Sequence, residues 1–535
     1  RVLLIDFCMP YTTEEIVEPF WAEFSSAASG RDPLAIQNSS VVIYTKMVVG
    51  ITNVTNRIRY NGFYCWIFDT ILQSITKKNS LQEQIRYSRR AELLLAYLMV
   101  KNFEGITGVS GSAYAAKNLS PTISLKHGAD WESKKENGPG LYWKFKLGVF
   151  GQYYSGVVRD LNLINHPNAQ VDLNIYTLTE KGKELAKSFE ENIPKEERDL
   201  FWSSVYNGKI KESDLAKLKS FALHVIPKGS SERSIYEKAL LAADNKKAEP
   251  SFNRRETIKL ILSHLNEHNE GVENLVSSFL RANYRSHQKE VVLKKDTATA
   301  WYLFEINELI HVAFEHFHAC FLYFIETYPT LLDQKIDDLV NETMKAFELE
   351  GSLVGINSIK QLAEQIKKEE EDIYFAYDEM EKYFRSREFG TCLMHAVKTI
   401  LHVQVNCNAQ LEQLEEFASA PENNFNRIGY AIELIDDLVI SQRELSVQEY
   451  VKAMIIKAIN LHTFSSYSKT RIGQSLVHNY MIEDFSVWRL RETLPNRTTP
   501  RLQNVLQYIM DIGWIKREGK VYTITEAGTK IIGGV

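Results

Sequence analysis

The last part of the sequence, from Arg497 to Ile532, constrains the fold most. The patterns of a helix, a terminating glycine and two strands follow one another there. Four apolar residues recur there at the spacing of one helix face; they are Leu502, Val505, Leu506 and Ile509. Thr498 or Thr499 can cap the start of this helix, and Gly513 follows its last apolar residues, as at many helix ends. The segment therefore predicts a short amphipathic helix that stops at Gly513.

A two-stranded hairpin with a basic tip is predicted directly after this helix. Its first strand begins at Trp514 and Ile515, and residues 517–520, Arg-Glu-Gly-Lys, form a charged turn. Apolar and polar residues then alternate over 521–526, which is the period of a returning strand. A helix followed by such a hairpin resembles the winged-helix superfamily. The resemblance implies a fold whose members bind DNA in some cases and protein in others.

The same order of elements is predicted a second time, earlier in the chain. Residues 175–182 read Ile-Tyr-Thr-Leu-Thr-Glu-Lys-Gly, and residues 521–528 read Val-Tyr-Thr-Ile-Thr-Glu-Ala-Gly. Residues 161–164, Leu-Asn-Leu-Ile, and the polar residues 166–170 precede the first string, as a strand and a turn would. The sequence therefore favours two winged-helix-like units. The alternative is that both strings are ordinary strand-to-helix junctions in which a threonine caps the helix.

Composition places the chain among globular proteins with several domains. It has 535 residues, a mass of 61.6 kDa, 44% hydrophobic residues and a net charge of −5. This slight acidity excludes bulk electrostatic binding of nucleic acid, so a DNA contact needs a local basic patch. Five scattered cysteines without zinc or redox spacing predict a reduced, cytoplasmic location. No apolar run approaches the ~20 residues of a membrane span, so no membrane association is predicted.

A short signature stands near the start of the chain, within residues 50–66. Its members are Gly50, Thr55, Arg57, Arg59, Tyr60, Phe63 and Trp66. This spacing resembles the N-terminal signature of uncharacterised bacterial proteins encoded among phage-defence genes. The resemblance implies a role in bacterial defence against foreign DNA and no particular chemistry. From the residues alone, Arg57 and Arg59 either contact nucleic acid or a partner, or pair with acidic neighbours at a domain seam.

Another basic group stands on the helix that the sequence predicts over residues 81–100. Arg86, Arg89 and Arg90 occupy the first half of this helix, and its second half is apolar. These arginines are a second candidate contact for nucleic acid or a partner. A solvated helix face is the favoured alternative.

The predicted fold is mainly α, with a helical middle flanked by two winged-helix-like units that contain small β-hairpins. We place an N-terminal helical and winged-helix-like domain at 1–195 and a polar helical connector at 196–252. An all-helical partner-binding domain covers 253–470, where helical patterns follow one another without a clear strand. The C-terminal winged helix covers 471–535.

Two clusters of histidine and glutamate are the candidates for a metal site. Glu308 and His311 have the Glu-x-x-His spacing of di-iron bundles, but the helical region has no second such motif. His264, Glu267 and His268 have the order of the inverted zinc peptidases, in a polar stretch typical of a helix end. Structural histidines explain both clusters better. The sequence therefore predicts no cofactor and no metal.

The DNA-binding prediction depends on the C-terminal unit. Arg501, Asn504 and Tyr508 recur at helical spacing opposite the apolar face, and Arg and Asn are residue types that read guanine and adenine. Four further cations are expected to contact phosphates; they are Arg497, Lys516, Arg517 and Lys520. The alternative is a solvated helix face that contacts no DNA.

The favoured function is a non-enzymatic DNA-binding or adaptor subunit of a bacterial defence complex. Its expected partners are double-stranded DNA and an ATPase or nuclease subunit, with the helical middle binding the partner; a homo-oligomer is left open. Two alternatives stay open as well. One is a stand-alone winged-helix transcription regulator, which binds its DNA site as a dimer. The other is a metal-dependent enzyme with an unfamiliar site, for which the two histidine clusters are the candidates.

Overall fold

The computed structural model describes residues 23–24, 32–74, 80–131, 140–168, 174–241, 250–268, 270–421, 423, 425, 431–470 and 475–533. As predicted, the chain is mainly α-helical, and small two- and three-stranded sheets accompany the helices. It divides into two compact units: unit 1 comprises Arg1–Thr45 and Ser277–Pro500, and unit 2 comprises Lys46–Val276 and Arg501–Val535. The sequence predicted four consecutive segments instead, because periodicity along one chain does not show which distant stretches pack together.

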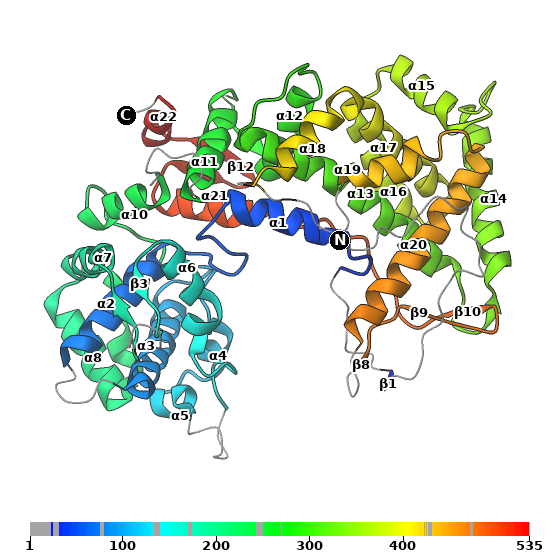
Figure 1. Cartoon of the computed structure of the whole chain (residues 1–535). Helices are drawn as coiled ribbons and strands as arrows, with labels where there is room; N and C mark the ends of the chain where they lie inside the picture. Colours follow the sequence, from blue (N-terminus) through cyan, green and yellow to red (C-terminus); the bar gives the residue numbers. More distant parts are fainter. Residues whose placement is uncertain are drawn as a thin grey trace. The chain divides into compact units, whose positions relative to one another are not determined.

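Unit 1 is a stack of helices around one long helix, α13 (Thr297–Phe324), as Figure 1 shows. Asp296 caps α13 by accepting a bond from Thr299 N, and nearly every residue up to Leu322 is buried. Because α13 is buried on all sides, it has neighbours on all sides. The longer helices packed against it are α14 (Leu332–Glu350), α16 (Ile373–Ser386), α17 (Phe389–Cys407) and α20 (Val447–Lys469).

Shorter elements complete unit 1. The helices are α15 (Ile359–Glu369), η6 (Asn408–Gln410), α18 (Leu411–Ser419), α19 (Ala431–Ile435) and η7 (Asp436–Ile440). Two further helices, α1 (Gln37–Met47) and α12 (Leu275–His287), run across the boundaries between the units. β1 (Glu23–Phe24) pairs in parallel with β8 (Ser475–Leu476).

A small antiparallel sheet of unit 1 escaped the sequence analysis. Its order is β7 (Thr330–Leu331), β10 (Ser486–Arg489) and β9 (Tyr480–Glu483). Asp484 and Phe485 form the turn between β9 and β10 with φ values of 46° and 62°. A glycine is the usual residue at such positions. The turn therefore lacks the glycine by which most hairpin turns are identified in a sequence.

Unit 2 begins with two buried helices, α2 (Arg59–Ser74) and α3 (Leu81–Asn102), the second of which lies where the sequence predicted a helix. Around them lie α4 (Ser112–Lys117), α5 (Leu125–Ala129), α8 (Lys195–Asn207), α9 (Glu212–Leu215) and η5 (Lys219–Phe221). α10 (Ser231–Leu241) and α11 (Pro250–Asn266) follow, and β2 (Thr122–Ser124) pairs with β5 (Lys209–Lys211).

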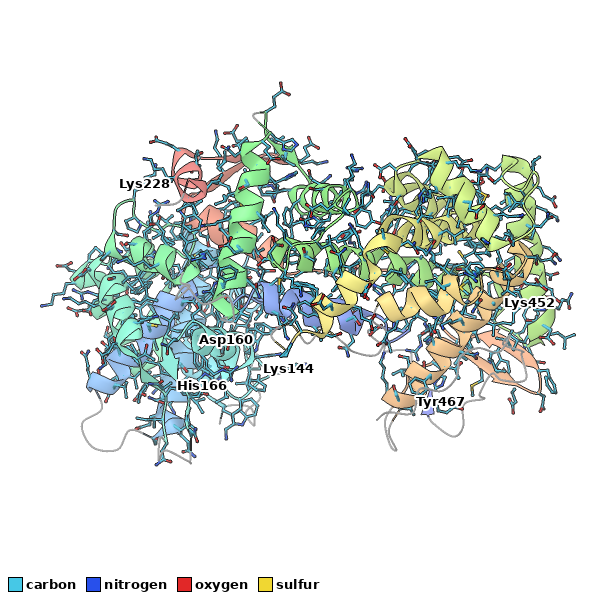
Figure 2. All side chains as sticks on the ribbon, turned by 45° about the horizontal axis from the view of Figure 1, so that its top comes forward. Lys144, Asp160, His166, Lys228, Lys452 and Tyr467 are labelled. Carbon is cyan, nitrogen blue, oxygen red and sulfur yellow. The ribbon has the colours of Figure 1, made fainter. Side chains whose placement is uncertain are left out.

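Unit 2 also contains a helix, a hairpin and a second helix in each of the two places where the sequence predicted a winged-helix-like unit. Copy 1 comprises η3 (Phe150–Tyr154) and α6 (Ser155–Asp160), β3 (Ile164–Asn165), β4 (Thr177–Leu178) and α7 (Glu180–Glu191). Copy 2 comprises α21 (Leu502–Asp511), β11 (Ile515–Glu518), β12 (Val521–Ile524) and α22 (Glu526–Ile532). The strands of each copy are antiparallel. Figure 2 labels Asp160 and His166, which stand at the end of α6 and just after β3.

Both copies leave the first helix by the same backbone path. Asn162 and Gly513 adopt left-handed φ values of 54° and 73° directly after the helix. The next residue then bonds back to the helix, with Leu163 N to Val158 O at 2.8 Å and Trp514 N to Ile509 O at 2.9 Å. This is the helix ending for which glycine or asparagine is preferred. The predicted stop at Gly513 is confirmed.

Two features of copy 2 differ from the expectation. α21 begins at Leu502, with Arg501 at the cap position and no side-chain cap bond, so the predicted caps Thr498 and Thr499 are wrong. β12 also pairs with a short third strand, β6 (Val272–Glu273). Among the described residues, no helix combines the length and the apolar character needed to cross a membrane.

Candidate nucleic-acid interface

The tip of the β11–β12 hairpin carries three of the exposed cations of copy 2. They are Lys516, Arg517 and Lys520. Gly519 turns the chain with a φ of 61°, and Glu518 lies 2.9 Å from the nearest of these cations, Lys516. The guanidinium of Arg517 donates to Gly519 O at 2.9 Å and lies 5.3 Å above the ring of Tyr522. With three cations against one carboxylate, the tip stays positive.

The predicted reading face of α21 is not exposed, which corrects the sequence analysis. Asn504 is 5% exposed and Tyr508 is 0% exposed. Asn504 Nδ2 donates to Thr55 O at 3.3 Å and to Asn56 Oδ1 at 2.9 Å. Arg501 adopts a φ of 58° and donates to the backbone of Ile51 at 3.0 Å. These residues hold α21 to the loop of residues 50–58 and leave no exposed Arg–Asn–Tyr stripe for base contacts.

The exposed side of α21 carries different residues, which the sequence analysis missed. Gln503 is exposed, and Gln507 and Met510 are half-buried on the same side. Glutamine at positions i and i+4 of a helix shares one face, and glutamine can bond adenine as asparagine does. The spacing was therefore visible in the sequence. It gave no signal, because neutral amides on a helix are ordinary surface residues.

The loop of residues 50–58, which contains the first part of the signature, connects copy 2 to the rest of unit 2. Gly50 has a φ of 81°, and a Cβ there would lie 2.9 Å from Leu161. Thr52 and Thr55 close a tight turn, because Thr52 N donates to Thr55 Oγ1 at 3.0 Å. Both features fix the path of the loop. The signature residues Gly50 and Thr55 thus have a structural role.

Arg57 pairs with an acidic residue of copy 2 and does not face solvent. Its Nη1 lies 2.7 Å from Asp511 Oδ1, and its other nitrogens donate to Thr107 O at 3.2 Å. Ile58 N and Gln507 Nε2 also donate to Asp511. Burial raises the pKa of Asp511 to about 6, while Arg57 and these two donors act to lower it. The alternative of an ion pair is therefore the one that the structure shows.

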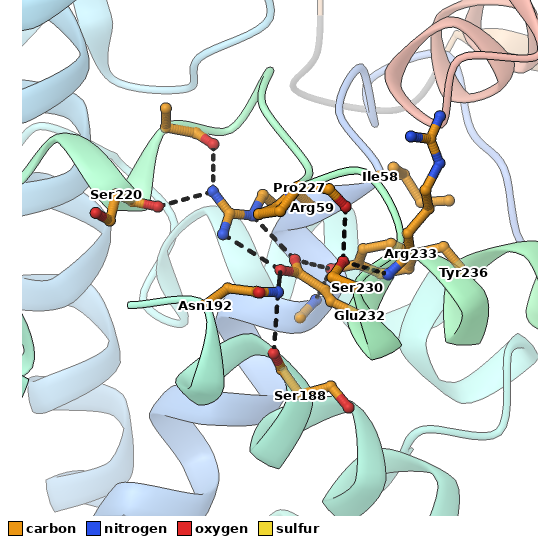
Figure 3. A network of polar contacts seen from close by, with 12 residues as sticks. Ile58, Arg59, Ser188, Asn192, Ser220, Pro227, Ser230, Glu232, Arg233 and Tyr236 are labelled. Atoms are coloured by element: carbon orange, nitrogen blue, oxygen red, sulfur yellow. Dashed lines mark hydrogen bonds and ion pairs between the residues drawn. The ribbon is translucent and has the colours of Figure 1, made fainter. Parts of the chain in front are cut away.

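Arg59 has the same kind of buried role, which Figure 3 shows in a close view. Its Nε and Nη2 donate to the two carboxylate oxygens of Glu232 at 2.9 and 3.2 Å. Its Nη1 donates to the backbone of Ser220 and Ala222 at 2.8 and 2.7 Å. Asn192 adds a bond of 2.7 Å to Glu232. With both ions 2% exposed or less, nucleic acid cannot reach this pair.

The aromatic residues of the signature form part of the core of unit 2. Phe63 packs edge-on against Phe201 at 6.0 Å between ring centroids, and Trp66 lies 5.4 Å from Phe221. Tyr60 is buried, and its hydroxyl accepts a bond from Ser110 N at 3.2 Å. The signature therefore describes how unit 2 is held together. None of its side chains forms an exposed binding surface.

Two of the three arginines on α3 are also buried. Arg89 donates to the backbone carbonyls of Ala129, Phe145 and Trp143. Arg90 forms a two-bond ion pair with Asp130 at 2.7 and 2.6 Å. Both the phosphate contact and the solvated face proposed for these two residues are therefore wrong. Arg86 is half-buried on the same helix.

Arg497 belongs to unit 1, where it forms an ion pair with the fully buried Glu305 of α13. The backbone on either side of it is bound to the same helix. Asn496 N donates to Glu315 at 2.6 Å, and Thr498 N donates to Glu308 at 2.7 Å. Three carboxylates of α13 thus hold residues 496–498. The expected phosphate contact of Arg497 is wrong.

The first metal candidate, Glu308 and His311, is part of this buried charge network. His311 lies 3.4 Å from Glu308 and 3.1 Å from Glu315. Burial disfavours both charges, but each ion stabilises the other. The pKa of His311 consequently rises to about 10, and that of Glu308 falls to about 2. The pair is thus part of the network of α13 that also binds the backbone of residues 496–498.

The second metal candidate lies at the end of α11. His268 Nδ1 bonds the backbone of His264 at 2.7 Å, and the two rings lie 4.6 Å apart. Burial lowers the pKa of His264. Within the described parts of the chain, no three His, Cys, Asp or Glu side chains come together as a metal site.

A polar cleft opens beside the hairpin tip, within unit 2. It lies between α21, the hairpin and the backbone of residues 107–108, and it encloses about 240 Å³. Its walls include Asn56, Gln503, Gln507, Arg517 and Tyr522. The exposed side of α21 and the basic tip therefore share one concave surface.

Comparisons of the chain with family models, with curated proteins and with solved structures give no match.

Proposed function

We propose that the chain binds nucleic acid through the basic tip of copy 2, as a non-enzymatic subunit of a bacterial defence assembly. The observation that supports this most is the tip itself, where Lys516, Arg517 and Lys520 are exposed on a short hairpin. Exposed Lys and Arg bind the phosphate backbone and release its counterions. A chain with a net charge of −5 needs such a local patch for this purpose.

Copy 2 is, in this proposal, a winged-helix-like unit whose wing is the β11–β12 hairpin. A wing contacts phosphates beside the groove. Since Asn504 and Tyr508 are buried, α21 does not lie in a major groove with that face. The proposed contact is therefore with the phosphate backbone, and we expect little dependence of the affinity on the sequence of a duplex.

The defence setting is supported by the resemblance of the signature in residues 50–66. A partner ATPase or nuclease supplies the chemistry in this proposal, and unit 1 offers the surface for that partner. A stand-alone transcription regulator needs a base-reading element. The burial of the predicted one makes this alternative less favoured.

The test compares two triple variants in the binding of a short labelled duplex, measured by fluorescence anisotropy at low salt. The first replaces Lys516, Arg517 and Lys520 with Ala. The second replaces Lys209, Lys211 and Lys219, which are exposed elsewhere on unit 2. Both remove three positive charges, so a difference between them reports the location of the charges.

We expect the tip variant to bind about tenfold more weakly or worse, because three cations that bind phosphate are removed. The control variant should stay within about twofold of the wild type. Equal affinities of all three proteins would remove the tip from the interface. An equal decrease in both variants would indicate an effect of total charge alone.

A further inference from the structure

The cleft beside the tip is small, and its walls combine polar side chains with Met510 and Tyr522. Its volume of about 240 Å³ lies below the ~300–1,000 Å³ of pockets that hold drug-sized molecules. Gly108 on its rim has a φ of 81°, and a Cβ there would approach Asn56 Cβ to 2.7 Å. Only a glycine allows residues 56 and 108, which both line the cleft, to come this close. The cleft has room for one planar heterocycle and excludes a double helix.

The amides in the walls present both kinds of hydrogen-bonding group. Asn56, which lines the cleft, accepts from Asn504 with its Oδ1, and its amide nitrogen is left as a donor. Gln507 Nε2 donates to Asp511, which leaves Gln507 Oε1 as an acceptor. Gln503, which is exposed, adds one donor group and one acceptor. The edge of a nucleobase carries the same mixture of donors and acceptors.

Arg517 connects this cleft to the basic tip. Its Nε is used by Gly519 O, and its guanidinium lies over the Tyr522 ring, so the group is held at the mouth of the cleft. A guanidinium in this place can bond a phosphate with its two terminal nitrogens. Lys516 and Lys520 stand on the same hairpin tip, in reach of neighbouring phosphates.

We infer that the cleft receives one unpaired nucleotide of a bound strand, with the base between the amides of Gln503, Gln507 and Asn56 and its phosphate on Arg517. This inference rests on the proposed function and deepens it, because it names the form of nucleic acid. A base must leave its stack to enter so small a space, as in single-strand and base-flipping proteins. Single strands and duplexes with an unpaired nucleotide are therefore preferred over perfect duplexes.

The test measures three probes against each protein: a short single-stranded DNA with 2-aminopurine at its centre, a perfect duplex, and the same duplex with one unpaired 2-aminopurine. The cleft variants are Gln503→Ala and Gln503→Glu, the second of which keeps the shape and adds a negative charge. Gln73→Ala, an exposed glutamine on α2, is the matched control. The tip triple variant serves as the reference for phosphate contact.

We expect Gln503→Ala to weaken binding of the single strand and of the unpaired nucleotide about tenfold, with the perfect duplex unchanged. Gln503→Glu should weaken both further, because it repels the phosphate on Arg517. The 2-aminopurine emission should change on binding to the wild type and to Gln73→Ala, and much less with Gln503→Ala.

Three results would overturn the inference. Affinities that do not depend on Gln503, with a clear decrease in the tip variant, would leave the proposed function standing and remove the cleft from it. Affinities that depend neither on Gln503 nor on the cations of the tip would contradict the proposed function itself. A peptide with a free carboxyl end that binds only when Gln503 is present, and that displaces the strand, would assign the cleft to a protein partner.

Discussion

The two helix–hairpin–helix copies of unit 2 have the same backbone design and different surfaces. In both, a threonine caps the second helix: Thr179 accepts from Gly182 N at 3.1 Å, and Thr525 accepts from Gly528 N at 3.2 Å. In both, this threonine also bonds the backbone that leaves the first helix. The residues that the two copies have in common are thus those that fix the junction between the hairpin and the second helix.

The differences between the copies lie at positions that do not determine this junction. Between its two strands, copy 1 has residues 166–176 and no Lys or Arg, whereas the tip of copy 2 has three cations. Asp160 and Asp511 are each the last residue of the first helix; Asp160 is exposed, and Asp511 pairs with Arg57. Copy 2 therefore combines a basic tip with a buried anchor to the signature loop. The comparison separates residues that build the unit from residues that give it a binding surface.

The largest expected effect is the dependence of the melting transitions on pH. It tests whether both copies are stabilised together within unit 2, separately from unit 1. Unit 1 contains three wholly buried neutral histidines: burial lowers the pKa of His316 to about 4, of His318 to about 3, and of His462 well below its usual range. These histidines contribute fully to the stability of unit 1 above pH ~6.5, because their imidazoles are then neutral in the unfolded chain as well. This contribution decreases as pH falls from ~6.5 toward ~4, by up to about 1.4 kcal/mol per histidine and pH unit.

In calorimetry at pH 7 and pH 5, we therefore expect the melting transition of unit 1 to move far more than that of unit 2. Among the described residues of unit 2, the one buried histidine is His264, which is 7% exposed. His318→Asn should reduce the pH dependence of the unit 1 transition. A pair of transitions that move together would show that the copies are not stabilised within one separate unit.

The next effect concerns the glycine that both copies share. A Cβ on Gly182 would lie 2.0 Å from Leu163 O, and one on Gly528 would lie 2.2 Å from Trp514 O. Each of these close approaches is to backbone that cannot rotate away. Gly182→Ala and Gly528→Ala should each destabilise unit 2 by about 1–3 kcal/mol, measured by urea unfolding.

Gly156→Ala is the control for these variants, because a Cβ there meets nothing within 4 Å. It lies in α6 of copy 1, where alanine favours a helix, so we expect unchanged stability or a gain of about 0.5–1 kcal/mol. If Gly528→Ala were as harmless as Gly156→Ala, the close approach in copy 2 would not exist.

The smallest effect on stability is expected for the caps. Thr179→Ala and Thr525→Ala each remove one cap bond and should cost about 1 kcal/mol. Thr→Ser keeps the hydroxyl and should recover most of this stability. The same unfolding measurement checks both pairs. Unequal effects in the two copies would mean that the shared threonine has different roles in the two places.

The sequence was sufficient for the parts of the fold that are set locally. Gly513 as a helix stop, the hairpin around Gly519 and the echo at residues 175–182 all follow from neighbouring residues, and the structure contains each of them. The turn at Asp484 and Phe485 could not be predicted this way. It places two non-glycine residues at positive φ, so its sequence lacks the glycine that indicates a hairpin turn.

The fate of the charged residues could not be predicted, because their partners are remote in sequence. Asp511 lies 454 residues after Arg57, and Glu232 lies 173 residues after Arg59. Helical spacing shows that Asn504 and Tyr508 share a face, and it does not show that the loop of residues 50–58 covers that face. Of the predicted DNA contacts, only Lys516, Arg517 and Lys520 are exposed.

The most direct test of the central claim, phosphate binding by the tip of copy 2, is the salt dependence of nucleic-acid affinity. The logarithm of the association constant is measured against the logarithm of salt concentration for the wild type and for the variant with Ala at 516, 517 and 520. We predict that the magnitude of the slope falls by about 2 to 3 in the variant, close to one unit for each phosphate that it no longer binds. Identical slopes would contradict the claim.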